Sequence, residues 1–437
     1  MFYRRKLNVK DENPVVFIPG LFGSMGRDII PGTGDFDFGM SEYIYRPLID
    51  NLEDMGYKEG KDLFVAHYDW RKKNIYSAEK YLIPVIKKAK DTTGKHKVNL
   101  ICHSMGGIVA RSYIQTQLYK HDVQKLIMIG TPNCGSINAY YFWSGGMLPY
   151  DKIENNVFYR LLKAGFLWIF KLIHGTRCNL EILRGLFPVV EELLPSYENG
   201  DYLILKEDNK LDRYIPISKM SIRNDLLNSL NKKANLIYRY GIKTYLIVGS
   251  SVKTNYQIYV KNFNSNCNTW KDGKPLHSVE TLYGDGTVTC KSAQSFAGRI
   301  KYINGDHMNI LTDSKEIIAN ILMRKTEESN MRIEKDRVAK IYSILADNIS
   351  EIQIAVDNKK ISINKGKFTV NDSYIVRKVG ENIYWVMLKS ITENEIDLKI
   401  YPEKDKESHV LILCGEKNNK ITKISDKTIK SKLVLTL

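Results

Sequence analysis

The run Val-Asn-Leu-Ile-Cys-His-Ser-Met-Gly-Gly at residues 98–107 places a serine between a short apolar segment and a segment that favours a helix. Its first four residues predict a buried strand, and the residues after the serine carry apolar side chains at helical spacing. A serine at such a junction is held on a sharp, strained corner above a sheet, where a base and a substrate can reach its hydroxyl. The run matches the Gly-x-Ser-x-Gly pattern at Gly106 and departs from it at Cys102. Ser104 is therefore the candidate nucleophile.

Apolar and helical segments alternate along most of the first 330 residues. The segments expected to be strands are residues 15–18, 63–67, 98–101, 125–129, 243–248 and 299–303, and those expected to be helices are 76–90, 105–118 and 314–324. Ser314 is a plausible N-cap of the last helix. Right-handed crossovers between such segments produce a mostly parallel sheet. The sequence therefore predicts an α/β catalytic domain over residues 1–330.

Residues 134–240 interrupt this alternation. They are rich in aromatic residues and leucine at helical spacing, and they show no clear strand. The segment follows a predicted strand, at the end of a sheet where functional loops of α/β folds lie. We expect a helical cap insertion, with the apolar residues 161–173 as the cover of a substrate pocket. The alternative is that these helices belong to the ordinary core.

Residues 331–437 have a different pattern. Short segments with alternating polarity are separated by Asn, Lys, Glu and Gly turns, at 352–356, 360–363, 374–379, 384–388, 396–400, 409–414 and 432–435. This pattern predicts a small all-β accessory domain. It contains no catalytic motif, so we expect a structural or docking role.

Charge and cysteine content limit the possible partners. The formal net charge is +16, and residues 1–330 carry +11 of it. No basic helix or RNA-binding signature accompanies the charge, which argues against nucleic acid and favours contact with an anionic membrane surface. The six cysteines form no Cys-x-x-Cys pair, so we expect no metal and no cofactor. The sequence shows no signal peptide or membrane span, which predicts a cytoplasmic or membrane-peripheral protein.

A serine nucleophile needs a base and a carboxylate that orients the base. After a strand-serine-helix elbow these follow in the chain order Ser, Asp or Glu, His. His307 lies in a turn between a predicted strand and the closing helix, whereas the other downstream histidines lack this context. Asp285 is held between two glycines ahead of it, and Asp306 is the alternative acid. Because Asp306 is adjacent to His307, we expect it to point elsewhere and assign the role to Asp285.

Acyl transfer also requires two backbone N–H groups directed at the developing oxyanion. The residue after the nucleophile, Met105, supplies the first. The second is expected from the turn after the strand at residues 15–18, with Leu21 as the donor and Phe22 as the alternative.

Several motifs together resemble the lecithin:cholesterol acyltransferase-like branch of the α/β-hydrolases. They are Pro-Gly-Leu-Phe-Gly-Ser at 19–24, Tyr-Asp-Trp-Arg at 68–71, Cys-His-Ser-Met-Gly-Gly at 102–107, Gly-Thr-Pro-Asn-Cys-Gly-Ser at 130–136, Phe-Pro-Val-Val-Glu-Glu-Leu-Leu-Pro-Ser at 187–196 and Gly-Asp-Gly-Thr-Val at 284–288. The resemblance implies an α/β-hydrolase fold with Ser104, Asp285 and His307 as the triad. It also implies that Tyr68, Trp70 and Arg71 line or brace the site, and we expect Phe22 to join them in binding substrate.

These observations predict a serine esterase or lipase that acts on lipid acyl esters through an acyl-serine intermediate. An alcohol in place of water would make the same residues an O-acyltransferase. A non-catalytic binding protein on a hydrolase fold is the alternative from another class, and the presence of all three triad residues argues against it.

Overall fold

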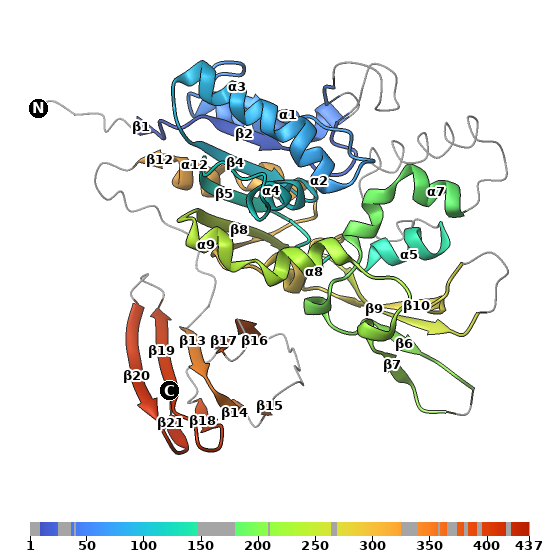
Figure 1. The fold of residues 1–437 in the computed structure, drawn as a ribbon, viewed down its shortest axis with the longest axis vertical. Helices are drawn as coiled ribbons and strands as arrows, with labels where there is room; N and C mark the ends of the chain where they lie inside the picture. Colours follow the sequence, from blue (N-terminus) through green and yellow to red (C-terminus); the bar gives the residue numbers. More distant parts are fainter. Residues whose placement is uncertain are drawn as a thin grey trace, which may run out of the picture. The chain divides into compact units, whose positions relative to one another are not determined.

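The computed structural model describes residues 9–24, 36–38, 41–146, 180–208, 210–263, 269–324, 340–356, 359–364, 374–379, 383–390, 396–416 and 421–436. The chain divides into two compact units, Met1–Glu328 and Ser329–Leu437. Figure 1 shows the elements of each unit.

A six-stranded sheet forms the centre of the first unit, with all neighbouring strands parallel and the order β11-β8-β5-β4-β2-β3. Its strands are β2 (Val15–Ile18), β3 (Leu63–Val65), β4 (Val98–His103), β5 (Val123–Ile129), β8 (Lys243–Ser250) and β11 (Arg299–Asn304). These are the six strands expected from the sequence, so the α/β prediction is confirmed. Every residue of β4 is buried, and its carboxyl end carries Ser104.

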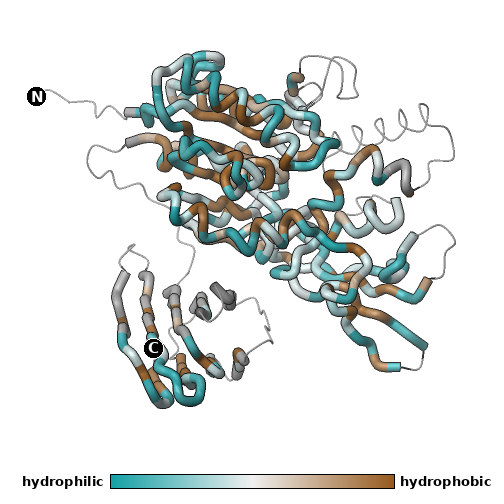
Figure 2. The backbone as a smooth tube through the Cα atoms, viewed as in Figure 1, coloured by the Kyte–Doolittle hydropathy of each residue, from teal (hydrophilic) through white to brown (hydrophobic). Residues whose placement is uncertain are grey.

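Helices cover both faces of this sheet (Figure 1). They are α1 (Glu42–Asp54), α2 (Asn74–Ser77), the π-helical turn η2 (Ala78–Leu82), α3 (Ile83–Thr93), α4 (Gly106–Ile114), α10 (Cys290–Ala293), α11 (Asn309–Asp313) and α12 (Lys315–Leu322). Alternate residues of each central strand enter different cores: Ile18 and Cys102 pack in one, Phe17 and Ile101 in the other. Figure 2 shows the resulting concentration of hydrophobic residues along the central strands.

The expected cap is only partly helical. Residues 134–240 contain α5 (Asn138–Gly145), α7 (Leu180–Leu186), α8 (Asp225–Lys232), α9 (Asn235–Arg239) and the short 3-10 turns η4 (Pro188–Leu193), η5 (Tyr197–Asn199) and η6 (Ile217–Lys219). They also contain two strands that the sequence analysis did not predict, β6 (Leu203–Leu205) and β7 (Arg213–Ile215). The expected cover at residues 161–173 lies outside the described residues.

These two strands belong to a second sheet of the first unit, in the order β10-β9-β6-β7, and none of its four strands was predicted from the sequence. Its other strands are β9 (Thr254–Lys261) and β10 (Lys274–Thr281). Three residues are too few to show alternation, and the buried side chains of β6 receive their packing from β9, about fifty residues later. The insertion therefore contains helices, as expected, and in addition two strands of this second sheet.

A smaller difference concerns Ser314. Its hydroxyl donates a hydrogen bond to the carbonyl of Leu311 (2.7 Å) and does not cap α12.

The described residues of the second unit are almost entirely strands, in two antiparallel sheets of order β16-β17-β13-β19-β20 and β15-β14-β18-β21. The strands are β13 (Lys340–Asp347), β14 (Ile349–Val356), β15 (Lys359–Asn364), β16 (Tyr374–Val379), β17 (Ile383–Ser390), β18 (Asp397–Pro402), β19 (Ser408–Glu416), β20 (Ile421–Ile429) and β21 (Leu433–Thr436). Ile344 and Val386 of one sheet share a core with Ile352 and Leu398 of the other. The expected all-β composition is confirmed.

Candidate active site

Ser104 occupies a strained corner between β4 and α4. Its φ angle is 52°, in the left-handed region that a residue with a side chain rarely adopts. Its N–H donates to the Ile129 carbonyl of β5 (2.8 Å), and its carbonyl accepts from the Gly107 N–H (3.1 Å). The corner is therefore fixed by backbone hydrogen bonds, which leaves the hydroxyl free to face other groups.

The two glycines after Ser104 are required by packing. A Cβ atom at Gly106 would overlap the carbonyl oxygens of Ile18 and Pro19, and one at Gly107 would overlap the side chain of Thr131. The first turn of α4 thus lies directly against the segments that follow β2 and β5. This close approach explains the Gly-Gly pair of the motif.

His307 links Ser104 to Asp285. Its Nε2 lies 2.9 Å from Ser104 Oγ, and its Nδ1 lies 2.7 Å from Asp285 Oδ2. The side chains of His307 and Asp285 are only 7% and 1% exposed. A carboxylate only accepts hydrogen bonds, so Nδ1 carries the proton and Nε2 is available to accept one from the serine. The structure thus brings together the three residues predicted as a triad.

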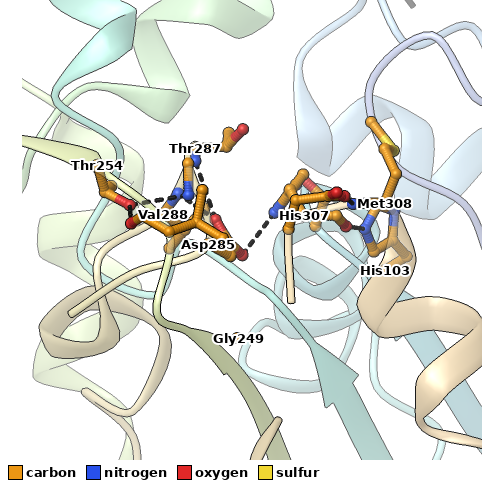
Figure 3. Close-up of polar contacts among 12 residues, drawn as sticks. His103, Gly249, Thr254, Asp285, Thr287, Val288, His307 and Met308 are labelled. Atoms are coloured by element: carbon orange, nitrogen blue, oxygen red, sulfur yellow. Dashed lines mark hydrogen bonds and ion pairs between the residues drawn. The ribbon is translucent and has the colours of Figure 1, made fainter. Parts of the chain in front are cut away.

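Asp285 is held in place by its own turn (Figure 3). Its Oδ1 accepts hydrogen bonds from the N–H groups of Thr287 (2.9 Å) and Val288 (2.7 Å), and its main-chain carbonyl accepts from the His307 N–H (2.8 Å). A Cβ atom at Gly249 of β8 would lie 2.7 Å from the Asp285 Cβ, so this glycine lets the acid approach the sheet. With Oδ1 occupied by the backbone, Oδ2 is directed at His307.

Asp306, the alternative acid, has a different role. Its carboxylate accepts from the N–H groups of Met308 (3.0 Å) and Asn309 (2.9 Å) and from the Asn309 side chain (2.6 Å). It therefore stabilises the turn after His307, at the start of α11, and points away from the ring of His307.

The turn after β2 lies against the serine. A Cβ atom at Gly20 would be 2.9 Å from the Ser104 Cβ. Among the residues that the structure describes, the N–H groups of Leu21 and Met105 have no hydrogen-bond acceptor. Both expected donors are thus available for a substrate oxygen. Phe22, the alternative donor, has a φ angle of 62° and packs edge-on against Trp70.

Tyr68 and Trp70 are hydrogen-bonded to the main chain of this turn. The Tyr68 hydroxyl donates to the Pro19 carbonyl (2.8 Å), and Trp70 Nε1 donates to the Ser24 carbonyl (2.9 Å). Each side chain is about 1% exposed. Of the two roles expected for them, the geometry supports bracing, because neither offers an exposed surface to a substrate.

Arg71 is engaged in a forked ion pair. Its Nε and one terminal nitrogen each lie 2.8 Å from an oxygen of Asp69, and its side chain is 17% exposed. Its main-chain carbonyl accepts from the Val189 N–H of η4 (3.4 Å). Arg71 therefore joins the segment after β3 to the insertion with its charge already balanced.

Two further residues at the site were not singled out by sequence reasoning. His103 precedes Ser104, and Tyr45 lies on α1; both are about 1% exposed and hydrogen-bonded to each other (3.1 Å). The position of His103 inside the serine motif was the one available signal. Tyr45 gave none, because it lies 58 residues earlier.

The part of the chain that the structure describes contains neither a metal-binding cluster nor a membrane-spanning helix. No group of three or more His, Cys, Asp or Glu residues is arranged to hold a metal ion. No helix within the described ranges has the length and apolar character needed to cross a membrane.

The lecithin:cholesterol acyltransferase family matches this chain at residues 37–208. Lecithin-cholesterol acyltransferase-like 4 of Arabidopsis thaliana is 25% identical over 315 residues, which are 63% of this chain and 57% of the relative. Phospholipase A(1) LCAT3 of the same plant is 35% identical over 100 residues, or 22% of each protein. The mature form of the Bacillus licheniformis lipase BlEst2 aligns over 74% of this chain and 95% of its own, with 16% identity and a TM-score of 0.39. The chain thus spans a little over half the length of the first of these relatives.

Proposed function

We propose that this chain is a member of the lecithin:cholesterol acyltransferase-like α/β-hydrolases and that it cleaves the acyl ester bond of a lipid through an acyl-serine intermediate on Ser104. The observation that carries the proposal is the continuous series of hydrogen bonds from Ser104 through His307 to Asp285. The choice of a lipid ester is supported by the relatives, one of which is a phospholipase A(1).

The geometry supports the following steps. His307 Nε2 takes the proton of Ser104 Oγ as this oxygen attacks the ester carbonyl carbon. The carbonyl oxygen becomes negative, and the N–H groups of Leu21 and Met105 bind it. Asp285 holds the other ring nitrogen and stabilises the imidazolium. The imidazolium then gives its proton to the departing alcohol, and an acyl-serine remains.

Water completes hydrolysis. His307 removes a proton from a water molecule, whose oxygen attacks the carbonyl carbon of the acyl-serine. The bond from this carbon to Ser104 Oγ then breaks, the imidazolium returns the proton to Oγ, and the fatty acid leaves. An acceptor alcohol in the place of this water would receive the acyl group instead. Acyl transfer is the second candidate function, because another relative of this chain is acyltransferase-like.

The experiment is a panel of acyl esters and phospholipids of different chain lengths, with products separated in the presence and absence of an acceptor alcohol. Ser104→Ala should reduce turnover by at least about 10³-fold. Ser112→Ala, a buried serine on α4 outside the site, is the matched control and should keep normal turnover. Equal turnover by wild type and Ser104→Ala would exclude the mechanism, and formation of a new ester would identify a transferase.

We also propose that the first unit contacts anionic membrane surfaces peripherally. Its sequence up to residue 330 carries +11 of the net charge, and an enzyme acting on lipids must meet its substrate at an interface. Binding to anionic vesicles should weaken as salt rises, and neutral vesicles are the control. Absence of binding to anionic vesicles at low salt would exclude this contact.

A further inference from the structure

His103 is the last residue of β4 and directly precedes the nucleophile. Its Nε2 lies 2.9 Å from the main-chain carbonyl oxygen of His307, and its Nδ1 lies 3.1 Å from the hydroxyl of Tyr45. The same hydroxyl lies 3.0 Å from the main-chain nitrogen of Gly20. The His103 side chain thus contacts the turn that carries His307 directly, and the turn that carries Leu21 through Tyr45.

Gly20, Tyr45, His103 and His307 thus form a series of hydrogen bonds. The proton positions in this series follow from the chemistry of its members. A carbonyl oxygen only accepts, so His103 Nε2 carries a proton and donates a hydrogen bond to the main-chain carbonyl oxygen of His307. The Gly20 N–H only donates, so the Tyr45 oxygen accepts it and directs its own proton to His103 Nδ1. Every group is satisfied in this arrangement, and His103 is neutral. Burial also favours the neutral ring: it lowers the pKa of His103 well below its usual value, and the neighbouring His307 lowers it further.

The series lies in a tightly packed part of the core. Tyr45 stacks against Phe38, with ring centroids 5.3 Å apart, and the rings of His103 and His307 are 4.8 Å apart. A displacement of Tyr45 or His103 would therefore be passed to both turns. Because Gly20 lies against Ser104 and the His307 ring is 2.9 Å from Ser104 Oγ, either turn can alter the reacting geometry.

We propose that His103 and Tyr45 are positioning residues, which fix the turn of the catalytic histidine and the oxyanion turn against Ser104. This inference rests on the proposed function, since it assigns a role in the same acylation step. A shift of about 1 Å in a reacting group can cost about 10²-fold in rate. Loss of the series should accordingly lower kcat and leave KM nearly unchanged, because neither side chain faces the substrate.

The first test compares Tyr45→Phe with Tyr113→Phe. Tyr113 is also about 1% exposed, and its hydroxyl donates to Asp122 (2.6 Å) outside the site, so both variants lose a buried hydrogen bond. The measurements are kcat and KM on a soluble short-chain ester, the rate at which a fluorophosphonate modifies Ser104, and Tm. Tyr45→Phe should lower kcat and the phosphonylation rate by about 10- to 100-fold, with KM changed less than about threefold. Tyr113→Phe should lower Tm comparably and keep kcat.

The second test separates the two contacts of His103. In His103→Gln, an amide N–H can reach the position of Nε2 and restore the bond to His307, whereas in His103→Asn the shorter amide reaches only the position of Nδ1. We expect His103→Gln to retain more of the wild-type kcat than His103→Asn. If Tyr45→Phe does not fold, this pair decides the question.

Two results would overturn the inference: wild-type kcat in Tyr45→Phe and His103→Asn, or a fall in kcat in Tyr113→Phe as large as that in Tyr45→Phe at a comparable loss of Tm. Failure of the proposed function would look different, because Ser104→Ala would then keep its turnover.

Discussion

Replacing Asp285 with asparagine tests the orientation of His307 directly. The carboxylate accepts three hydrogen bonds, two on Oδ1 from Thr287 and Val288 and one on Oδ2 from His307. An amide has a single acceptor oxygen, and the two backbone N–H groups would hold it on the Oδ1 side. Its NH₂ group then faces His307 Nδ1, which must become the acceptor, so the proton moves to Nε2. A protonated Nε2 cannot accept the proton of Ser104.

The expected loss follows from this change of tautomer. In a serine protease, the same Asp-to-Asn change in an intact triad lowers kcat about 10⁴-fold. At about 1.4 kcal/mol for each factor of ten, this raises the barrier by about 5 to 6 kcal/mol. The shape of Asp285 is preserved in asparagine, so we expect a folded protein with a normal KM.

Asp306→Asn is the matched control, because it removes the same charge one residue from His307. Its carboxylate serves only Met308 and Asn309 in the described hydrogen bonds, and its loss should change kcat by no more than a few fold. Both variants are assayed for kcat and KM on a soluble ester between pH 6 and 9. Equal losses in the two variants would show that charge near His307, and not the orientation of its ring, controls the rate.

Two further predictions concern stability. Gly106→Ala should destabilise the protein by about 1 to 3 kcal/mol in urea unfolding, because its Cβ overlaps backbone oxygens, whereas Gly185→Ala has open space and should not. Burial lowers the pKa of His67 to about 4, against a smaller opposing effect of Asp37. The contribution of the neutral ring to the free energy of unfolding is therefore present above pH 6.5 and is lost as the pH falls towards 4. His67→Gln should remove up to about 3 kcal/mol of this acid-dependent loss, measured by unfolding at both pH values.

The central sheet could be predicted because its strands are short apolar segments, most of them buried on both faces. The second sheet could not. Residues of β10 are mostly polar or exposed, and β6 and β7 have three residues each. The strand character of β10 and β6 depends on pairing with β9, and that of β7 depends on pairing with β6. Such strands form because another segment of the chain pairs with them, and the local sequence does not identify that segment.

A similar distinction applies within the active site. Ser104, Asp285 and His307 each lie in a turn whose glycines or flanking strand identify it locally. Tyr45 lies inside the amphipathic helix α1, where an aromatic residue is an ordinary core residue. It meets His103 only because α1 packs on that face of the sheet. Local sequence therefore identifies the reacting groups better than the groups that position them.

The departure at Cys102 shows which part of the serine motif the structure constrains. Cys102 lies within β4, is completely buried and packs in the same core as Ile18, while the tight approaches fall on Gly106 and Gly107. A glycine at position 102 is thus not needed for the corner at Ser104. Cys102→Gly should leave kcat/KM within about twofold and destabilise the protein by about 1 to 2 kcal/mol. A buried side chain is lost, and glycine loses more conformational entropy than cysteine when the strand forms. Cys102→Ala should lose less stability, and a gain in kcat/KM of tenfold or more in Cys102→Gly would show that the cysteine distorts the corner.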